Sequence, residues 1–368
     1  MEISNGNAKE SLIYLSHITW NWIKQRPQYI AEELAKSYDL TYVEPQVHKD
    51  RGLKQNDVQG LALRELPRVP TLGDRLKFVV KYNDRVARRT VANLLRNSGS
   101  RLVWVASPVA YKWLPDSYEG AVIYDCMDDH SAFVTGSDKE EIDRLEQALV
   151  KRADLVLASS ARLSEKIVSL CPTKARDRVL IVRNAFDGKV ITYTNESHRK
   201  DSAFKACYFG TIGPWFDFEC IAASLRTFPG LSYKIIGPVD EGVEILDDSR
   251  IEYTGPVAHE ELADFVSDCS CFVMPFVVND VVLSVDPVKM YEYINYGKDI
   301  VCVSYPEVER FSDFAELYNG SDGYCSALEA VMERGRRKYT DKQRTAFLAD
   351  SSWMSRIEPV LHALGEIR

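Results

Sequence analysis

The sequence lacks several features that would each decide its class at once. It contains no uncharged apolar run of about 18 residues, so we expect no membrane-spanning helix. Its opening residues, MEISNGNAKE, hold no basic segment followed by an apolar core, so we expect no secretory signal. No repeat of roughly 20–50 residues is apparent, which argues against a solenoid. What is present is a globular composition, 45% hydrophobic and 27% charged over 368 residues, a length that suggests about two domains.

Closely spaced cysteines are nearly absent. The eight cysteines are scattered, and only Cys269 and Cys271 lie near each other. A C-x-C pair at a predicted helix-to-strand junction matches no strong zinc or redox spacing. We therefore expect buried free thiols in a cytoplasmic protein.

A basic surface is missing from the second half of the chain. The net charge is −8, but residues 1–200 carry 31 Lys and Arg against 26 Asp and Glu, whereas residues 201–368 carry 15 against 28. Nucleic acid would require a basic face. The acidic second half therefore argues against a nucleic-acid partner.

Short apolar runs alternate with helical patterns along the whole chain, which predicts an α/β fold with parallel sheets. One cycle occupies the first half, and a second begins at KACYFGTI (205–212). The polar, aperiodic stretch TNESHRKDS separates them. We expect two Rossmann-like doubly wound domains facing a cleft, an N-terminal domain over 1–190 and a second domain over 204–350. The predicted strands are 11–16, 40–44, 102–106, 121–126, 155–160 and 179–184, then 205–212, 231–239, 251–257, 271–276 and 300–305; helices are expected at 26–37, 74–97, 138–151, 161–170 and from about 327 onward.

The segment DPVKMYEYINYGKDIV, residues 286–301, has a helix start that faces the predicted cleft. Asp286 is the expected N-cap and Pro287 suits the first turn. Free amides at such a start, with the positive end of the helix dipole, can hold a diphosphate. Lys289 would add a positive charge, and Glu292, one turn on, could accept hydrogen bonds from two ribose hydroxyls. The alternative is a capped surface helix with a solvated Lys and Glu.

The same segment resembles the signature of GT-B glycosyltransferases, in particular the family 4-like enzymes of bacterial polysaccharide assembly, which show Pro-x-Lys-x-x-Glu-Tyr before a glycine turn and a buried strand. The likeness extends along the chain. RADLVLASSARLSEKI resembles the end of the first domain in that family, and YFGTIGPWFDFE (208–219) the glycine loop that opens the second. SWMSRIEPVLHAL (352–364) resembles the terminal helix that crosses back, so the resemblance implies that 351–368 packs on the first domain.

By this resemblance, the donor would be a nucleotide sugar, with UDP as the default, and no metal cofactor would be needed. Glu292 would bind the ribose and Lys289 the pyrophosphate. One departure concerns Ser284, which stands where retaining members often carry a second glutamate. The remaining donor contacts implied are Gly210, Thr211, Pro238, Ser284, Val285, Pro287 and Val288.

A loop after the first predicted strand contains a histidine and two tryptophans. His17, Trp20 and Trp22 could stack on and hydrogen-bond to a sugar, or they could simply pack the loop. Arg26, at a helix start facing the cleft, is a candidate for reaching the donor phosphates, because an arginine is otherwise poorly placed beside the positive end of a helix dipole.

The stretch VIYDCMDDHSAF places acidic residues at the end of a buried strand. Inverting sugar transfer needs a carboxylate to take the proton of the acceptor hydroxyl. We expect Asp128 or Asp129 to act as base or sugar ligand, assisted by His130. A metal site of the Asp-x-Asp type and a capping cluster for the next helix are the alternatives.

Residues 64–101 are strongly basic, with ten Lys and Arg against three acidic residues. Lys77, Lys81, Arg85 and Arg88 follow one another at near i, i+4 spacing along one predicted helix face. The other, expected to be buried, is apolar and consists of Leu76, Val79, Val80, Val86, Val91 and Leu94. A solvated helix face is the ordinary explanation. Such a cluster would also attract an anionic leaflet by about 1 kcal/mol per basic residue, which suggests peripheral docking on the inner face of the plasma membrane.

These observations favour a glycosyltransferase that moves a sugar from a nucleoside diphosphate to a lipid-linked bacterial surface or capsular glycan. Two alternatives share the architecture. A nucleotide-sugar epimerase would act on the donor alone, and a non-catalytic GT-B-like partner subunit would bind without turnover.

Overall fold

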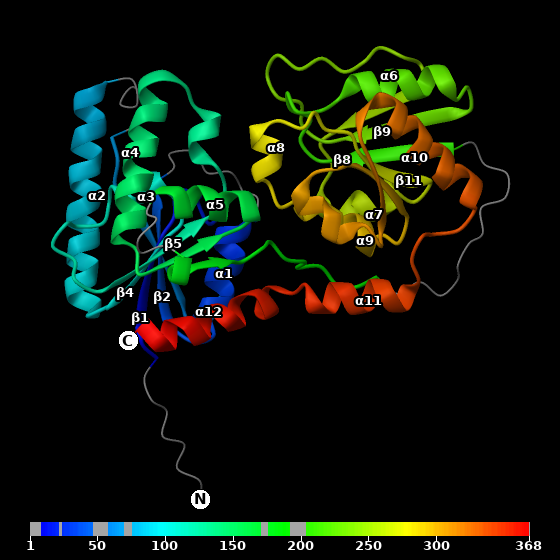
Figure 1. Ribbon diagram of the computed structural model, residues 1–368. Coiled ribbons are helices and arrows are strands. Elements are labelled where there is room, and N and C mark those ends of the chain that lie inside the picture. The colour runs from blue at the N-terminus through cyan, green and yellow to red at the C-terminus, as the bar shows by residue number, and fades with distance from the viewer. Residues whose placement is uncertain are drawn as a thin grey trace, which may run out of the picture. The chain divides into compact units, whose positions relative to one another are not determined.

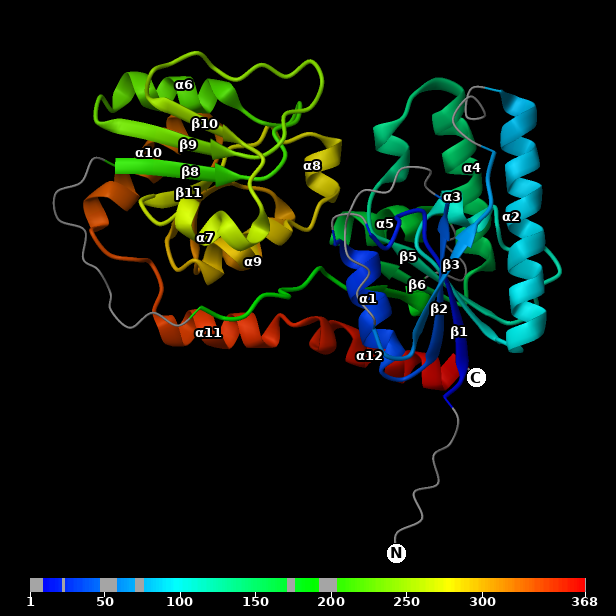
Figure 2. The same cartoon turned by 180° about the vertical axis from the view of Figure 1, so that it is seen from behind.

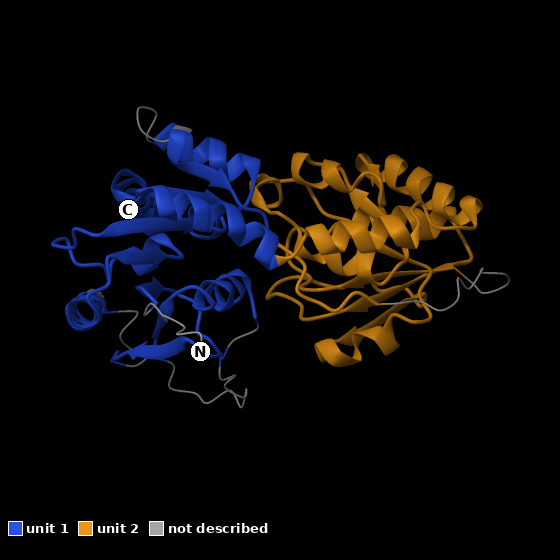
Figure 3. Cartoon of the chain, turned by 90° about the horizontal axis from the view of Figure 1, so that it is seen from below, with its two compact units in different colours: residues 1–184, 353–368 blue, residues 185–352 orange. Residues whose placement is uncertain are grey.

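The computed structural model describes residues 9–21, 24–46, 58–69, 76–170, 176–191 and 204–367. Trp22, Arg75, Cys171 and the expected linker at 192–203 lie outside these ranges. By contacts the chain divides into two compact units, shown in Figure 3. Unit 1 consists of residues 1–184 and 353–368, and unit 2 of residues 185–352.

Unit 1 is built on a parallel sheet. In its described residues the sheet has seven strands in the order β3-β2-β1-β4-β5-β6-β7. This is the doubly wound order, in which successive strands are added on one side of β1 and then, from β4 onward, on its other side. The strands are β1 (Ser11–Leu15), β2 (Asp39–Pro45), β3 (Leu61–Leu66), β4 (Leu102–Val105), β5 (Ala121–Cys126), β6 (Leu155–Ala158) and β7 (Val179–Ile181).

Helices cover both faces of this sheet (Figures 1 and 2). One face packs on α2, α3, α4 and α5 through a single apolar cluster. The other carries α1 and α12, which pack on each other, with the Trp353 ring stacked on Tyr29 at 5.3 Å. The helices of unit 1 are α1 (Arg26–Ala35), α2 (Lys77–Ser98), α3 (Pro108–Tyr111), α4 (Gly136–Arg152), α5 (Ala161–Leu170) and α12 (Trp353–Ile367).

Unit 2 repeats the same plan. Its described parallel sheet has six strands in the order β10-β9-β8-β11-β12-β13. The strands are β8 (Phe204–Phe209), β9 (Leu231–Ile236), β10 (Ile251–Gly255), β11 (Cys271–Met274), β12 (Asp299–Val303) and β13 (Ala315–Tyr318), and the helices are α6 (Phe218–Thr227), α7 (Leu262–Phe265), α8 (Asp280–Ser284), α9 (Val288–Asn295), α10 (Gly320–Arg334) and α11 (Asp341–Asp350).

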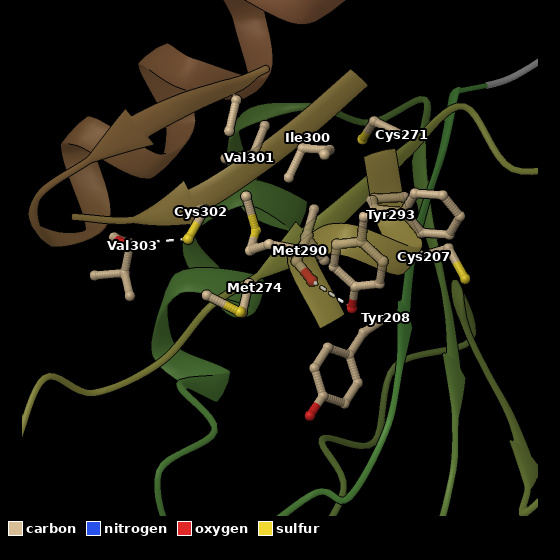
Figure 4. Packing of buried hydrophobic residues seen from close by; sticks show 14 of the residues in the cluster. Cys207, Tyr208, Cys271, Met274, Met290, Tyr293, Ile300, Val301, Cys302 and Val303 are labelled. Atoms are coloured by element: carbon tan, nitrogen blue, oxygen red, sulfur yellow. Dashed lines mark hydrogen bonds between the residues drawn. The ribbon is translucent and has the colours of Figure 1, made fainter. Parts of the chain in front are cut away.

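Strand register shows which face of the unit 2 sheet each helix covers. Tyr233 is paired with Ala206 and bonds to Ser224 and Tyr324, so α6 and α10 lie on that face. The side chains of Phe209 and Phe272 point to the opposite face, where both contact the Tyr293 ring of α9. Figure 4 shows Met290 and Tyr293 of α9 among side chains of β8, β11 and β12. This packing fixes the helix whose start carries the predicted donor site.

The strongly apolar strands lie within a few residues of their predicted positions, and the α/β class is confirmed. Two edge strands, β3 and β13, were not predicted, and residues 280–284, expected within a loop, form the short helix α8. The described cysteines are free thiols, and all but Cys325 are buried. Among the described helices, none combines the length and the apolar character needed to cross a bilayer.

Candidate functional site

Two glycines bring backbone segments of unit 2 unusually close together. Gly210 follows β8 and Gly237 follows β9, with φ values of 135° and 137° that favour glycine. A Cβ atom on Gly237 would lie 2.1 Å from the carbonyl oxygen of Gly210. The two strand ends therefore require glycine at both positions, and their backbones pack against each other at the carboxyl edge of the sheet.

Lys289 occupies the space over Gly210. A Cβ atom on Gly210 would lie 1.9 Å from Lys289 Cε, and the ammonium lies 5.7 Å from the centroid of the Tyr208 ring. Burial lowers the pKa of Lys289, partly offset by Glu292. No described residue forms an ion pair with this ammonium or accepts a hydrogen bond from it. A lysine that has lost much of its hydration without gaining an anion is a candidate anion ligand.

The start of α9 differs in one respect from the expectation. Pro287, not Asp286, is the N-cap, and no side chain caps the helix. Asp286 is buried and instead pairs with Arg310, which also bonds to the Tyr291 hydroxyl at 3.0 Å and to the Glu307 carboxylate at 3.1 Å. This ionic cluster fixes the position of the residue before the helix start. The first amides of α9 receive no side-chain cap.

Glu292 lies one turn into α9, as the spacing predicts. Its side chain is 28% exposed, and its Oε1 lies 3.0 Å from Nε2 of His259 in the loop after β10. The hydrogen bond to Glu292 raises the pKa of His259, with burial opposing it and Glu260 and Asp187 adding to the rise. Glu292 thus stands at the same edge as Lys289 with a partner from another element.

The other predicted donor residues differ in which of their hydrogen-bonding groups are already used within the protein. The Thr211 carbonyl accepts a hydrogen bond from the Tyr208 hydroxyl at 2.7 Å. Pro238 is exposed, and its carbonyl is bonded to the amide of Ile212 at 2.9 Å. Ser284 is buried and donates to the Asp280 carbonyl at 2.8 Å, so its hydroxyl is already used within α8.

The backbone just before α9 is partly occupied as well. The Val285 amide donates to the Val282 carbonyl at 3.1 Å, and Pro287 has no amide hydrogen to donate. Val288, by contrast, is 44% exposed at the first helical position. An anion at this helix start would therefore meet the amides of Val288 and Lys289 rather than those of the preceding residues.

In unit 1, the arginine that was predicted to reach the donor phosphates forms an ion pair with a buried carboxylate. The Arg26 guanidinium is buried and holds the buried Asp125 carboxylate with bonds of 3.0 Å and 2.8 Å. It also donates to the Asn184 side chain at 3.3 Å. This pair joins the start of α1 to the end of β5. The contact of Arg26 with donor phosphates stays a prediction.

The two neighbouring aspartates have different surroundings. Asp129 is bonded to Lys166 at 2.7 Å and to the Ser131 hydroxyl at 3.0 Å, and these contacts lower its pKa despite burial. Asp128 has no ion pair or side-chain hydrogen bond with any described residue. Burial raises the pKa of Asp128 to about 7, with Asp125 and Asp129 adding to the effect and Arg26 opposing it. Asp128 is therefore the carboxylate poised to exchange a proton near neutral pH.

Two histidines lie at the ends of the central strands. The rings of His17, after β1, and His130, after β5, meet edge to face at 5.2 Å between centroids. His17 Nδ1 and His130 Nε2 are buried without a hydrogen-bond partner in the described structure. Burial lowers the pKa of His17 to about 4 and that of His130 to about 3, so both imidazoles are neutral. Neutral imidazoles with unsatisfied nitrogens suit hydrogen bonding to a sugar hydroxyl.

Trp20 belongs to the packing of its loop. It is 7% exposed, its ring meets Tyr42 edge on at 5.0 Å, and its backbone amide donates to the Glu44 carboxylate. Within the described part of the chain, no group of three or more His, Cys, Asp or Glu side chains is arranged to hold a metal ion.

The outer face of α2 carries both charge and aromatic surface. Phe78 is 70% and Tyr82 56% exposed, and Lys81, Arg85 and Arg89 are exposed beside them at helical spacing. The structure corrects two details of the predicted helix faces: Arg88 bonds to the Asp116 carboxylate at 2.7 Å instead of joining the basic stripe, and Leu76, expected on the buried face, is 45% exposed. We call Phe78, Lys81, Tyr82, Arg85 and Arg89 the α2 stripe.

Several solved structures have the same architecture as this chain over nearly its whole length. Sucrose-phosphate synthase from Thermosynechococcus elongatus superimposes with a TM-score of 0.72 at 11% identity, covering 98% of this chain and 99% of the other. Lipopolysaccharide outer core galactosyltransferase WaaB gives 0.66 at 12% identity over 97% and 99%. HepE from Anabaena, solved with UDP and glucose, gives 0.64 at 12% identity over 97% and 99%. The chain has the GT-B fold.

In sequence, the GT-B chain is similar over nearly its whole length to a Bacillus subtilis (strain 168) protein named "Putative teichuronic acid biosynthesis glycosyltransferase TuaH". The two are 22% identical over 375 residues, covering 92% of this chain and 93% of the relative. No protein-family model matches the chain.

Three side chains of this GT-B chain were not singled out from sequence: His259 beside Glu292, Arg310 behind the α9 start, and Lys166, which joins Asp129 to the buried Glu146 at 2.7 Å each. His259 lies 33 residues from its partner and Arg310 lies 24. No periodic pattern connects such distant residues. The available signal was only that each one falls near the carboxyl end of a predicted strand.

Proposed function

We propose that this protein is a glycosyltransferase that moves a sugar from a nucleoside diphosphate, with UDP as the default, onto a lipid-linked bacterial surface or capsular glycan. The observation that carries this proposal is the Lys289 ammonium, desolvated over Gly210 at the uncapped start of α9 with no described anionic partner. A diphosphate supplies the charge that this position lacks. The likeness to glycosyltransferases along the whole chain supports a nucleotide sugar over other anions.

In unit 2, we assign Lys289 and the amides of Val288 and Lys289 to the diphosphate. These groups would stabilise the negative charge that develops on the leaving group. Glu292 would accept hydrogen bonds from the ribose hydroxyls. The half-buried backbone at Gly210 and Thr211, where Gly210 has no side chain, would let the donor approach, and Pro238 would lie beside the base. Because Lys289 and the helix start meet the charge, we propose transfer without a bound metal.

In unit 1, we assign the sugar chemistry to Asp128, His17 and His130. Asp128 forms no ion pair with a described residue, and burial raises its pKa to about 7, so it can take the proton of an acceptor hydroxyl or hold a donor-sugar hydroxyl near neutral pH. The two neutral imidazoles offer hydrogen-bonding nitrogens beside it. Asp129, tied to Lys166, serves to hold the loop.

The acceptor assignment rests on the α2 stripe and on the names of the relatives. TuaH is named for teichuronic acid biosynthesis and WaaB for the lipopolysaccharide outer core, both of which support a glycan acceptor. Exposed Phe78 and Tyr82 flanked by basic residues are the surface that an interfacial helix presents to an anionic leaflet. We therefore propose that the protein docks on the inner face of the plasma membrane, where a lipid-linked acceptor would be presented.

Calorimetry with UDP, ADP and GDP tests the donor site. We expect one nucleotide to bind, and Glu292→Ala to weaken it at least tenfold because two hydroxyl contacts are lost, whereas Glu329→Ala, an exposed glutamate of α10, leaves binding unchanged. Release of nucleotide from the matching nucleotide sugar should then require an acceptor and persist in EDTA. Failure of all three nucleotides to bind would refute the proposal, and near-normal affinity of Glu292→Ala would refute the ribose role.

A further inference from the structure

The hydrogen bond between His259 and Glu292 links two separate elements at the proposed donor edge. His259 opens a 3₁₀ turn (His259–Glu261) in the loop that follows β10, and Glu292 lies on α9. The imidazole is 72% exposed, and Nε2 lies 3.0 Å from Oε1 of Glu292. A surface pair of this kind contributes little to folding stability. The effect to consider is therefore how the hydrogen bond from His259 orients the Glu292 carboxylate.

A carboxylate has two oxygens and about four acceptor positions. His259 occupies one position on Oε1 and so restricts rotation of the Glu292 side chain, while the remaining positions stay available. Two vicinal hydroxyls can then donate to a carboxylate that is already held in place. An unrestrained glutamate would have to lose its rotational freedom when the ligand binds, and that loss would weaken binding.

Among the described residues, the charges that act most on the His259 imidazole include those of Glu292 on α9, Glu260 in the same 3₁₀ turn, and Asp187. All three are acidic, so they favour a proton on the ring. Donation from Nε2–H to Glu292 is available to the imidazolium and to one neutral tautomer. The contact is therefore compatible with a donating His259 across the neutral pH range.

We propose that His259 is a positioning residue that orients Glu292 toward the 2′- and 3′-hydroxyls of the donor ribose and thereby sets the preference for ribonucleotides over 2′-deoxyribonucleotides. This inference rests on the proposed function, since it assumes that Glu292 meets a ribose. It assigns no chemical step to His259.

The test compares the nucleoside diphosphate that binds best in the panel above with its 2′-deoxy analogue, by calorimetry. Wild-type protein should prefer the ribonucleotide at least tenfold. His259→Ala should lose about tenfold in ribonucleotide affinity, equivalent to about 1.4 kcal/mol, with little change for the deoxy analogue, so that the preference collapses. His259→Gln, whose amide nitrogen can replace Nε2–H, should restore much of it. His362→Ala, at an exposed histidine of α12, should match wild type.

Two results would overturn the inference. One rejects only the positioning role of His259, and the other also rejects the proposed function. If wild type binds a ribonucleotide and His259→Ala keeps the full preference, the positioning role fails while the donor site stands. If wild type binds no nucleoside diphosphate, the proposed function fails and the inference fails with it.

Discussion

At the scale of single residues, the proposed donor edge contains a glycine and a lysine that occupy adjacent space. Lys289 lies where any side chain at residue 210 would have to go. The resemblance of residues 286–301 to the GT-B signature, in which both residues sit on one helix turn, predicted Lys289 and Glu292 from sequence. The contacts of Arg26 could not be predicted in this way, since Asp125 is 99 residues away and only the folded sheet brings the two together.

Gly210→Ala should abolish most nucleotide binding. The new methyl group would collide with Lys289 Cε and would hold φ near 135°, a value that alanine rarely adopts. Gly242→Ala is the matched control, because Gly242 also has positive φ, 82°, but a Cβ there meets nothing within 4 Å. We expect at least a tenfold loss of affinity in calorimetry for the first variant and wild-type affinity for the second. Equal affinities would show that Lys289 does not need this space.

At the scale of elements, apolar content decided what could be predicted from sequence. Strands buried on both faces, such as β5 and β12, read as continuous apolar runs. Strand β3, with the sequence LALREL, carries Arg64 and Glu65 at the edge of the sheet, and Glu316 interrupts the apolar residues of β13, AELY, so neither gives such a signal. Both exist because a neighbouring strand offers them hydrogen bonds, which is tertiary information.

The proposed role of the α2 stripe, docking on an anionic membrane, depends only on its exposed basic and aromatic side chains. Wild-type protein should float with anionic vesicles and much less with neutral ones. Lys81→Glu with Arg85→Glu and Arg89→Glu should lose this binding, since each basic residue contributes about 1 kcal/mol near an anionic leaflet. Phe78→Ser with Tyr82→Ser should weaken it by removing the inserting rings.

The control for charge is a triple reversal in unit 2 at three exposed residues, Arg226→Glu, Arg336→Glu and Lys342→Glu, which changes the net charge by the same amount. Its flotation should equal that of wild type. Binding that falls equally in both triple variants would mean that overall charge, not the α2 stripe, governs attraction to the vesicles.

At the scale of the whole molecule, His17, His130 and Asp128 connect the proposed chemistry to stability. From about pH 4 to 6.5 the unfolded chain protonates both histidines, whereas the native protein, with histidine pKa values of about 4 and 3, does not. These two groups therefore make stability fall as pH drops through this window. Asp128 acts in the opposite sense, because burial raises its native pKa to about 7, above the ordinary value of 3.8 for an aspartate in the unfolded chain.

The thermal midpoint at pH 7 and pH 5 measures this balance. On moving to pH 5, His17→Gln with His130→Gln should lose less stability than wild type, and Asp128→Asn should lose more. Differences of about 2–4 °C are expected for a protein of this size. Identical pH dependence in all three proteins would show that these side chains are not held in the protonation states described here.

The helix α12 has a consequence for how the chain is synthesised. Unit 2 is one continuous segment, whereas unit 1 needs both residues 1–184 and the much later α12, whose Ile357 and Val360 are fully buried. A ribosome adds roughly 5–20 residues per second, so tens of seconds, on the order of 15–65, separate the emergence of α1 from that of its partner helix. During translation unit 2 can therefore complete its fold first. In unit 1, the apolar face of α1 stays uncovered until α12 has been synthesised.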